Sequence, residues 1–347
     1  MDTAWTHPFP FGDEFSIVVG DTRLFVVEPT RIAAHAWDDG APLWVSDLDA
    51  TVAPVVDEGR VFFAAEEQVH AVSEGSGHLE WRLPTGPLSI APTARSGWLI
   101  VAGETGTLTG VNASLGRVVW TAAISVPLTT PVSIDGDLVV AALADGRVTG
   151  WRITDGASRW ETKIGTRPVQ VLAAADRVFI AGQDGRLICL RQRDGQREWD
   201  YKFGMAVVGR LVADNTHVYA TTIDNTVRAH GFNGHQKWRK EVAARVVDGL
   251  IADSGRVFVP QSNGEIRIFT AETGERAGRL AGPEEGASVL GGLASAGAGR
   301  ALRMAITTSA ASELTVTAYQ PTGLAATVAA TGPPATTLGL VLPPVRR

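Results

Sequence analysis

The chain has 347 residues, of which 45% are hydrophobic and 20% are charged, and its net charge is −6. These values are typical of a folded globular protein and exclude a strongly basic chain that would neutralise nucleic acid phosphates. The single cysteine, Cys189, excludes an intrachain disulfide. The first residues lack the basic and apolar regions of a signal peptide, and no apolar run approaches the ~18 residues of a membrane span. We therefore expect no transmembrane segment, and either a cytoplasmic protein or a chain given without its leader.

A short motif, Gly-x-x-x-Trp, recurs along the chain with a nearly constant spacing. Its six copies run from Gly40 to Trp44, Gly77 to Trp81, Gly116 to Trp120, Gly156 to Trp160, Gly195 to Trp199 and Gly234 to Trp238. Successive tryptophans are 37, 39, 40, 39 and 39 residues apart. A period near 40 residues with strand-like units predicts a β-propeller.

Each repeat contains the signals of four antiparallel strands, and the tryptophan lies on the fourth. In one repeat the first three strands are predicted at residues 168–174, 177–182 and 186–192, and Trp199 follows. The turn between the second and third strands carries Asp145-Gly146, Asp184-Gly185, Asp224-Asn225 or Asn263-Gly264. Such pairs supply the positive φ angles of two-residue hairpin turns.

The third strand of each repeat carries a small residue near its middle. These residues are Ala34, Ala71, Gly110, Gly150 and Cys189, each six positions before the motif glycine, and Ala229, whose turn is one residue shorter. A bulky indole needs a shallow site on the neighbouring strand, and a small side chain provides one. We expect the tryptophan to pack there.

Eight sets of three inner strands can be counted along the chain. They begin near Phe15, Ala53, Leu88, Thr129, Pro168, Val208, Val246 and Ala287. The seventh repeat has Gly278 where tryptophan is expected, and the eighth has the loosest pattern. The sequence predicts an all-β, eight-bladed propeller of four-stranded blades, and a seven-bladed ring is the alternative if the last repeat is not a blade.

Two segments compete for the outer strand of the eighth blade. Trp5 lies 39 residues before Trp44, so residues 3–9 look like an outer strand without inner strands before it. Residues 324–331 are the other candidate. We predict that the strand around Trp5 closes the ring, which removes exposed sheet edges. Residues 1–331 then form one domain, and residues 332–347, with two Pro-Pro pairs, form an irregular tail.

The repeat resembles that of the PQQ-like (quinoprotein) propeller family. The segments from Gly150 to Trp160 and from Ala71 to Trp81 are similar to its tryptophan-docking motif, Ala-x-Asp-x-x-Thr-Gly-x-x-x-Trp. The family's aspartate is mostly missing here, and the threonine directly before the glycine of the motif is kept only at Thr273 and Thr322. The WD40 repeat is disfavoured because only one repeat tryptophan, Trp199, is followed by aspartate. The resemblance implies either a PQQ-dependent dehydrogenase or a cofactor-free scaffold, such as the lipoprotein component of the bacterial outer-membrane β-barrel assembly machine.

The residues themselves favour the scaffold. A residue repeated in many blades suits packing better than a unique cofactor site, so we assign structural docking to Trp5, Trp44, Trp81, Trp120, Trp160, Trp199 and Trp238. The family's dehydrogenases carry adjacent cysteines under the cofactor, and one cysteine excludes that pair. His230 and His235 flank a turn without a third ligand nearby, and Asp135-Gly136-Asp137 lacks the later acidic positions of a calcium loop. We expect no catalytic, cofactor-binding or metal-binding residue, no cofactor and no enzymatic activity.

Charge is distributed unevenly along the chain. Residues 1–80 carry 15 acidic and 3 basic side chains, residues 81–250 carry 15 and 20, and residues 251–347 carry 7 and 8. The acidic first repeats and the basic fifth and sixth repeats would face each other across an eightfold ring. A solvated surface explains this pattern, and a polarised ring that orients a partner is the sharper hypothesis. We predict a partner-facing basic sector that includes Arg239, Lys240 and Arg245.

We therefore predict a non-catalytic protein-binding scaffold that is monomeric on its own and has protein partners rather than nucleic acid. The resemblance implies an envelope-associated protein in the periplasm or at the outer membrane, with outer-membrane assembly components as partners. The alternatives are a PQQ-dependent oxidoreductase and a secreted propeller that binds a peptide or a glycan. Loops carry such functions, and nothing repeated in the sequence marks which loops matter.

Overall fold

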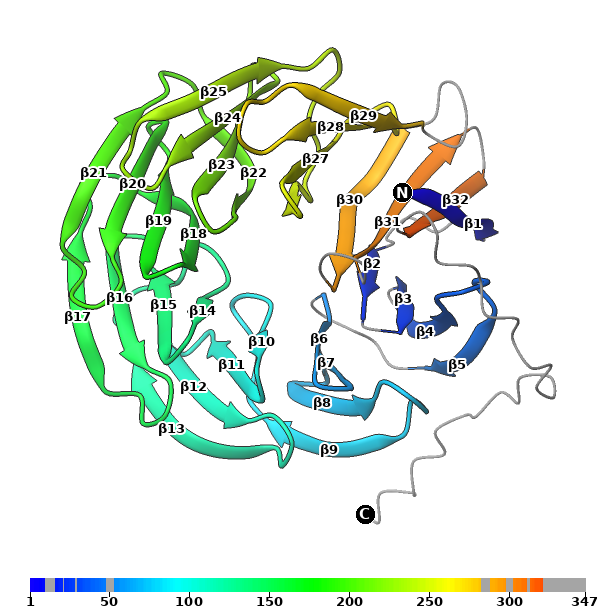
Figure 1. The fold of residues 1–347 in the computed structure, drawn as a ribbon. Coiled ribbons are helices and arrows are strands. Elements are labelled where there is room, and N and C mark those ends of the chain that lie inside the picture. Colours follow the sequence, from blue (N-terminus) through cyan, green and yellow to red (C-terminus); the bar gives the residue numbers. More distant parts are fainter. Residues whose placement is uncertain are drawn as a thin grey trace.

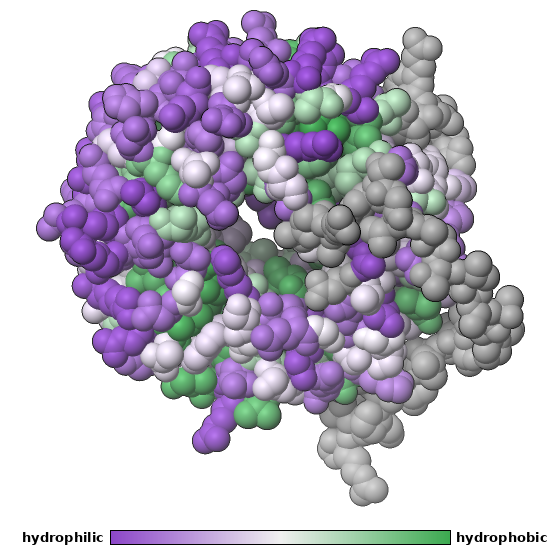
Figure 2. Space-filling model, in the orientation of Figure 1, coloured by the Kyte–Doolittle hydropathy of each residue, from purple (hydrophilic) through white to green (hydrophobic). Residues whose placement is uncertain are grey.

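The computed structural model describes residues 1–9, 16–20, 22–28, 30–47, 53–281, 288–297, 302–310 and 313–320. These residues form 32 strands in eight four-stranded antiparallel sheets and no helix. The sheets are arranged as blades around a central opening (Figures 1 and 2). The predicted eight-bladed propeller is confirmed, and the seven-bladed alternative is wrong because the last repeat forms a blade.

Blades 1 to 4 follow each other in chain order, each from its innermost to its outermost strand. Blade 1 consists of β2 (Ser16–Val19), β3 (Arg23–Glu28), β4 (Arg31–Ala36) and β5 (Pro42–Ser46). Blade 2 consists of β6 (Val55–Asp57), β7 (Arg60–Ala65), β8 (Gln68–Ser73) and β9 (Leu79–Pro84). Blade 3 consists of β10 (Thr93–Arg95), β11 (Trp98–Gly103), β12 (Thr107–Asn112) and β13 (Arg117–Ala123). Blade 4 consists of β14 (Ser133–Asp135), β15 (Leu138–Ala142), β16 (Arg147–Arg152) and β17 (Ser158–Lys163).

Blades 5 to 7 repeat this order, and blade 8 combines the two ends of the described chain. Blade 5 consists of β18 (Pro168–Ala174), β19 (Arg177–Gly182), β20 (Arg186–Arg191) and β21 (Arg197–Lys202). Blade 6 consists of β22 (Val207–Ala213), β23 (His217–Thr222), β24 (Thr226–Gly231) and β25 (Gln236–Glu241). Blade 7 consists of β26 (Ile251–Asp253), β27 (Arg256–Pro260), β28 (Ile266–Thr270) and β29 (Arg276–Leu280). Blade 8 consists of β30 (Ser288–Ala296), β31 (Arg303–Ala310), β32 (Glu313–Gln320) and β1 (Asp2–Phe9).

The N-terminal strand closes the ring, as the spacing of Trp5 predicts. β1 pairs antiparallel with β32, with Trp5 opposite Ala318 and Thr6 opposite Thr317. Blade 8 thereby gains an outer strand from a segment more than 300 residues away in the chain. The competing segment 324–331 and the predicted tail 332–347 lie outside the described residues.

The turns differ from the sequence prediction in one respect. In the four turns between the second and third strands that carry the predicted pairs, only the second residue has a positive φ, as at Gly146 and Asn225. Pairs with two positive φ angles lie mostly between the first and second strands, as at Ser96-Gly97 and Ser254-Gly255. Two positive φ angles characterise a type I′ hairpin turn, so the tightest turns are on the side of the first strand.

The hydrophobic core is divided among the seams between neighbouring blades. One cluster, for example, combines Leu138, Val148 and Trp160 of blade 4 with Val178 and Ile188 of blade 5. Alternating side chains of a strand point to opposite faces of its sheet. Each blade therefore buries both of its faces, one against each neighbour.

Candidate functional site

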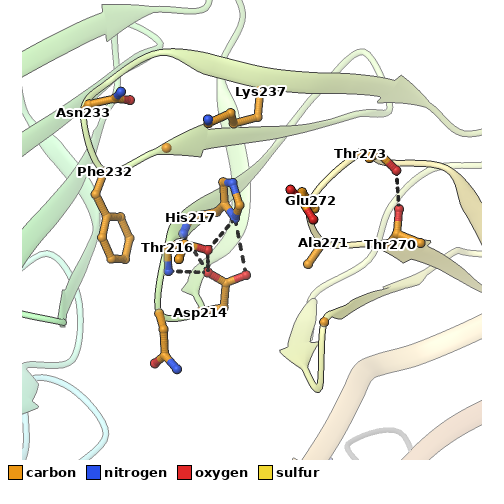
Figure 3. A pocket seen from close by; sticks show the side chains of 13 residues that line it. Asp214, Thr216, His217, Phe232, Asn233, Lys237, Thr270, Ala271, Glu272 and Thr273 are labelled. Carbon is orange, nitrogen blue, oxygen red and sulfur yellow. Dashed lines mark hydrogen bonds and ion pairs between the residues drawn. The ribbon is translucent and has the colours of Figure 1, made fainter.

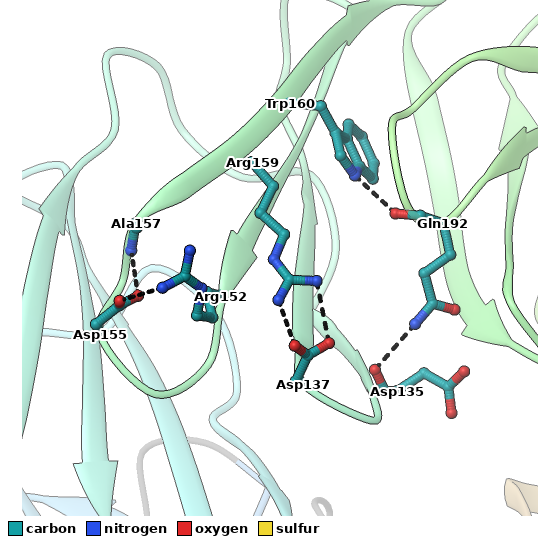
Figure 4. A network of polar contacts seen from close by, with 8 residues as sticks. All are labelled: Asp135, Asp137, Arg152, Asp155, Ala157, Arg159, Trp160 and Gln192. Atoms are coloured by element: carbon teal, nitrogen blue, oxygen red, sulfur yellow. Dashed lines mark hydrogen bonds and ion pairs between the residues drawn. The ribbon is translucent and has the colours of Figure 1, made fainter.

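The repeated tryptophans tie each blade to the next one. Seven indole N–H groups donate to a backbone carbonyl of the following blade, at N–O distances of 2.5 to 3.0 Å. The pairs are Trp5 with Trp37, Trp44 with Glu74, Trp81 with Ala113, Trp120 with Ile153, Trp160 with Gln192, Trp199 with Phe232, and Trp238 with Ala271. Figure 4 shows the bond from Trp160 to the carbonyl of Gln192. The side-chain amide of Gln192 in turn donates a hydrogen bond to the carbonyl of Asp135.

Two small residues make room for each indole. Cys189 and Trp199 are opposite each other across β20 and β21, as the sequence predicts for the small position of the third strand. The motif glycine of the next blade lies against the indole, and a Cβ placed on Gly195 would be 2.5 Å from the ring of Trp160. Gly195 also has a φ of +68°, which favours glycine. The indole rings are thus packed between neighbouring blades.

An open groove lies on the face of the ring formed by the turns that join first to second and third to fourth strands. It has a volume of about 1090 Å³ and runs between blades 6 and 7. Blade 6 supplies the turn residues 214–217, the turn residues 231–233 and Lys237 of β25, and blade 7 supplies Gly255 and residues 270–273. Figure 3 shows the two walls facing each other, with Glu272 on the blade 7 side.

Asp214 organises the blade 6 wall of the groove. Its carboxylate accepts hydrogen bonds from the backbone N–H groups of Thr216 and His217, both at 2.6 Å, and from the hydroxyl of Tyr219 at 2.6 Å. Burial acts to raise the pKa of Asp214, but these hydrogen bonds outweigh it, and the pKa lies below its ordinary value. The carboxylate is therefore ionised and engaged in holding the turn.

The other polar groups of the groove point to recognition of a polar segment. Lys237 and Glu272 are exposed, and neither forms an ion pair with a described residue. Thr273 and Thr270 share a hydrogen bond of 2.7 Å between their hydroxyls, and Asn233 is exposed at the rim. One ammonium, one carboxylate and several amides and hydroxyls can together bind the backbone and charged side chains of a peptide.

The side chains of the predicted basic sector, Arg239, Lys240 and Arg245, differ in direction and exposure. Arg239 and Lys240 are successive residues of β25, so their side chains point to opposite faces of the sheet; Arg239 is exposed and Lys240 is half-buried. Arg245 is exposed in the segment after β25. Directly opposite Arg239 on β24 lies Arg228, which is buried.

Arg228 is a site that the sequence did not reveal. Its guanidinium lies 3.5 Å from the carboxylate of Asp224 and 5.3 Å from the ring centroid of Phe203 in blade 5. Burial lowers the pKa of Arg228, Arg239 adds to this effect, and Asp224 opposes it. Two arginines opposite each other on neighbouring strands repel, so this part of blade 6 favours an anionic neighbour.

Two further candidates of the sequence, Cys189 and His230, are buried in this fold. Cys189 is fully buried, and burial, with Glu198 adding to it, raises the pKa of its thiol to about 12. His230 lies in the seam between blades 5 and 6, where its Nδ1 is 3.2 Å from the carbonyl oxygen of Gly234. Within the described ranges, no group of three or more His, Cys, Asp or Glu side chains could hold a metal ion. The same residues contain no helix long and apolar enough to cross a membrane.

Sequence reasoning missed the groove because its walls come from different blades. The only signal in the sequence is the polar character of two turns, Asp214-Asn215-Thr216 and Phe232-Asn233-Gly234. Polar turns occur in every repeat, so nothing in the sequence selects these two.

Comparison with known proteins identifies the family of the chain. The sequence profile of the family described as outer membrane protein assembly factor BamB matches residues 2–87, 28–171 and 165–283. The chain is 24% identical over 154 residues to the outer membrane protein assembly factor BamB of Shewanella oneidensis, covering 40% of this chain and 39% of that protein. It is 30% identical over 150 residues to BamB of Yersinia pestis, covering 37% of this chain and 38% of that protein. The alignments thus span about two fifths of the length of both relatives.

Solved structures show the same fold at low sequence identity. The designed protein Ika8 has a TM-score of 0.72 at 15% identity, covering 88% of this chain and 95% of its own. BamB of Moraxella catarrhalis has a TM-score of 0.58 at 16% identity, covering 78% of this chain and 97% of its own. The quinohemoprotein alcohol dehydrogenase ADHIIG of Pseudomonas putida HK5 has a TM-score of 0.68 at 11% identity, covering 99% of this chain and 78% of its own. At these identities the similarity shows the fold alone.

Proposed function

Because the chain belongs to the family described as outer membrane protein assembly factor BamB, we propose that it is a non-catalytic, protein-binding scaffold of a bacterial envelope. The observation that carries this proposal is the family match, which extends from β1 to beyond β29. The seven docked tryptophans support it, because they hold successive blades together in a platform on which exposed turns are fixed in space.

The partners we propose are protein components of outer-membrane assembly, as the names of the relatives suggest. The groove between blades 6 and 7 is the surface that we assign to one of them. Lys237 and Glu272 would pair with opposite charges of a partner segment, while Asn233 and Thr273 would hydrogen-bond its backbone. The mixed charge of the groove selects a polar segment rather than an apolar one.

Site-specific photo-cross-linking tests this assignment. A photoreactive residue is placed at Asn233 in the groove and, as a matched control, at Asp155, which occupies the same turn position in blade 4. We expect cross-links from position 233 to an outer-membrane assembly protein in the envelope fraction of the host, and none from position 155. Equal cross-linking from both positions, or none from position 233, would contradict the assignment.

The non-catalytic part of the proposal has its own test. Purified protein is titrated with PQQ in the presence of Ca²⁺, and alcohol oxidation is followed with an artificial electron acceptor. We expect neither saturable binding nor turnover. Stoichiometric PQQ binding with turnover would contradict the proposal of a non-catalytic scaffold and indicate an oxidoreductase.

A further inference from the structure

The outer edge of blade 3 carries neither charge nor proline over most of its length. β13 contains no charged residue and no proline from Val118 to Ala123. The outer strands β9, β17, β21, β25 and β29 each carry at least two charged residues, β1 carries Asp2 and Pro8, and β5 begins with Pro42. Charge and proline on an edge strand prevent other strands from pairing with it. Among the described outer strands, β13 lacks both over its last six residues.

The same edge exposes apolar side chains. Leu115, Val118 and Val119 are 68%, 43% and 47% exposed, and they account for half of the large exposed hydrophobic residues of the described chain. Hydrophobic surface is also visible at the rim of blade 3 in Figure 2. We call Leu115 together with residues 118–123 the blade 3 edge.

A bulge explains why Val119 is exposed. Trp120 is opposite Gly110 and Val118 is opposite Val111, so Val119 is an extra residue of β13 without a partner on β12. The corresponding extra residues are Glu80 in blade 2, Arg159 in blade 4, Glu198 in blade 5 and Lys237 in blade 6. Four blades thus place a charge where blade 3 places a valine.

The backbone of β13 defines what could bind there. Among the described strands, β13 pairs only with β12, so no described strand uses the outward N–H and C=O groups along Trp120–Ala123, and another extended chain could pair with them. Only an extended peptide backbone matches such a row of alternating donors and acceptors. The uncharged side chains beside it favour a segment that is itself uncharged and rich in β-branched residues.

From this geometry we propose that the blade 3 edge binds an extended, uncharged segment of a partner protein, which adds a fifth strand to blade 3. The fold itself contains such an addition, since β1 joins blade 8 as its outermost strand from the far end of the chain. This surface is separate from the groove between blades 6 and 7, and the inference does not depend on the proposed function.

Binding of a synthetic peptide to the full chain tests the inference. The probe is a fluorescein-labelled peptide of alternating Thr and Val with Lys at each end. The variant Val119→Lys introduces the residue that blade 6 has at the same place, so the fold should tolerate it. The matched control is Leu43→Lys, the same bulge position in blade 1. Circular dichroism and thermal unfolding verify that both variants are folded.

We expect the peptide to bind the wild-type chain and Leu43→Lys equally, and Val119→Lys at least about tenfold more weakly. A peptide N-methylated at alternate amides should lose binding to the wild-type chain, because it keeps its side chains but cannot form the strand ladder. Hydrogen exchange should slow at Thr121–Ala123 when the unmodified peptide is bound.

Three results would overturn the inference. One is equal affinity of the peptide for the wild-type chain and Val119→Lys. Another is unchanged binding of the N-methylated peptide, which would mean simple apolar adhesion. The third is a wild-type dimer in sedimentation that Val119→Lys converts to a monomer, since the occupant would then be a second copy of this chain.

Discussion

At the scale of single residues, each docked indole depends on a glycine in the next blade. Gly195 illustrates the two requirements, a positive φ and no room for a side chain against Trp160. Gly204 has a similar φ of +78°, but no heavy atom lies within 4 Å of the place where its Cβ would be. Comparing the two glycines separates the backbone requirement from the packing requirement.

Replacing these glycines by alanine should therefore have different effects. Gly204→Ala should lower the free energy of unfolding by about 1 to 2 kcal/mol, the cost of a left-handed backbone for a residue with a Cβ. Gly195→Ala should cost about 1 to 3 kcal/mol more, because the indole must also move. Urea unfolding of both variants measures the difference, and equal losses would show that the indole does not press on Gly195.

The indole N–H should contribute separately from the ring. Trp160→Phe keeps an aromatic ring in the seam but leaves the carbonyl of Gln192 without its donor. We expect a loss of about 1 to 3 kcal/mol in the free energy of unfolding. Trp98→Phe, at a tryptophan outside the repeat, is the control for the change in ring size. A loss no larger than that of Trp98→Phe would rule out a stabilising hydrogen bond.

Buried histidines should make the fold sensitive to acid. Burial lowers the pKa of His230 below its ordinary 6.5, the hydrogen bond with the Gly234 carbonyl opposes this, and Arg228 adds to it. Burial also lowers the pKa of His35 and of His70. A histidine with a depressed pKa binds fewer protons when folded than when unfolded. The free energy of unfolding should thus be unaffected by these histidines above pH 6.5 and should fall as the pH drops below that value.

The variant His230→Phe should reduce this loss of stability in acid, because phenylalanine cannot bind a proton. The fold should tolerate the change, since blade 7 has Phe269 at the equivalent position. The measurement is the urea midpoint at about pH 7.5 and about pH 5. His78→Ala, at an exposed histidine, is the control and should leave the pH dependence unchanged. An equal loss in wild type and His230→Phe would assign the acid sensitivity to other groups.

At the scale of elements, every outer strand of blades 1 to 7 has a bulge immediately before its tryptophan position. The extra residue often reaches the start of the second strand in the same blade. Glu80 lies 2.6 Å from Arg60, Glu198 lies 3.3 Å from Arg177, and Arg159 pairs with Asp137 (Figure 4). In these three blades the bulge thus adds a charge to the edge strand, which discourages pairing with other chains.

The joint between β1 and β32 can be tested by cross-linking. The hydroxyls of Thr6 and Thr317 are 3.4 Å apart across the joint, so Thr6→Cys combined with Thr317→Cys should form a disulfide. Oxidation should raise the free energy of unfolding by about 2 to 4 kcal/mol relative to the reduced form, because the bond closes a very long loop. Failure of the two cysteines to oxidise in the folded protein would contradict the register of this joint.

At the scale of the whole molecule, the charges of the ring are polarised. Within the acidic first 80 residues, β2 to β8 and the start of β9 belong to blades 1 and 2, which lie across the opening from blades 5 and 6 (Figure 1). Blade 6 adds the buried Arg228 opposite the exposed Arg239. Such an arrangement can orient an approaching partner without contributing much to the final affinity.

Reversing Arg239, Lys240 and Arg245 to glutamate tests this polarity. We expect weaker capture of the proposed partner at low ionic strength, and little difference from the wild-type chain at high ionic strength, where exposed charges are screened. The measurement is partner affinity as a function of salt concentration, with thermal unfolding as a check of the fold. Unchanged affinity at low salt would remove any role of this sector in binding.

The sequence alone was sufficient for the architecture. A glycine and a tryptophan at a period near 40 residues specify a repeating contact, and Trp5, one period before Trp44, predicts the closing strand. These features recur in each repeat, because a large indole needs a small residue beside it wherever it packs. They can therefore be recognised in the sequence. The turn pairs were predicted less well, since the positive φ at Gly146 and at Asn225 belongs to turns with a single left-handed residue.

Only the tertiary structure decided which surfaces are available for binding. The groove exists only because neighbouring blades bring Lys237 and Glu272 to its opposite walls. The repulsion between Arg228 and Arg239 depends on the strand register that places them opposite each other. The blade 3 edge requires Val119 to be the extra residue of a bulge. The repeat specifies how each blade packs, but single side chains that differ between blades acquire a role only when the ring brings them together.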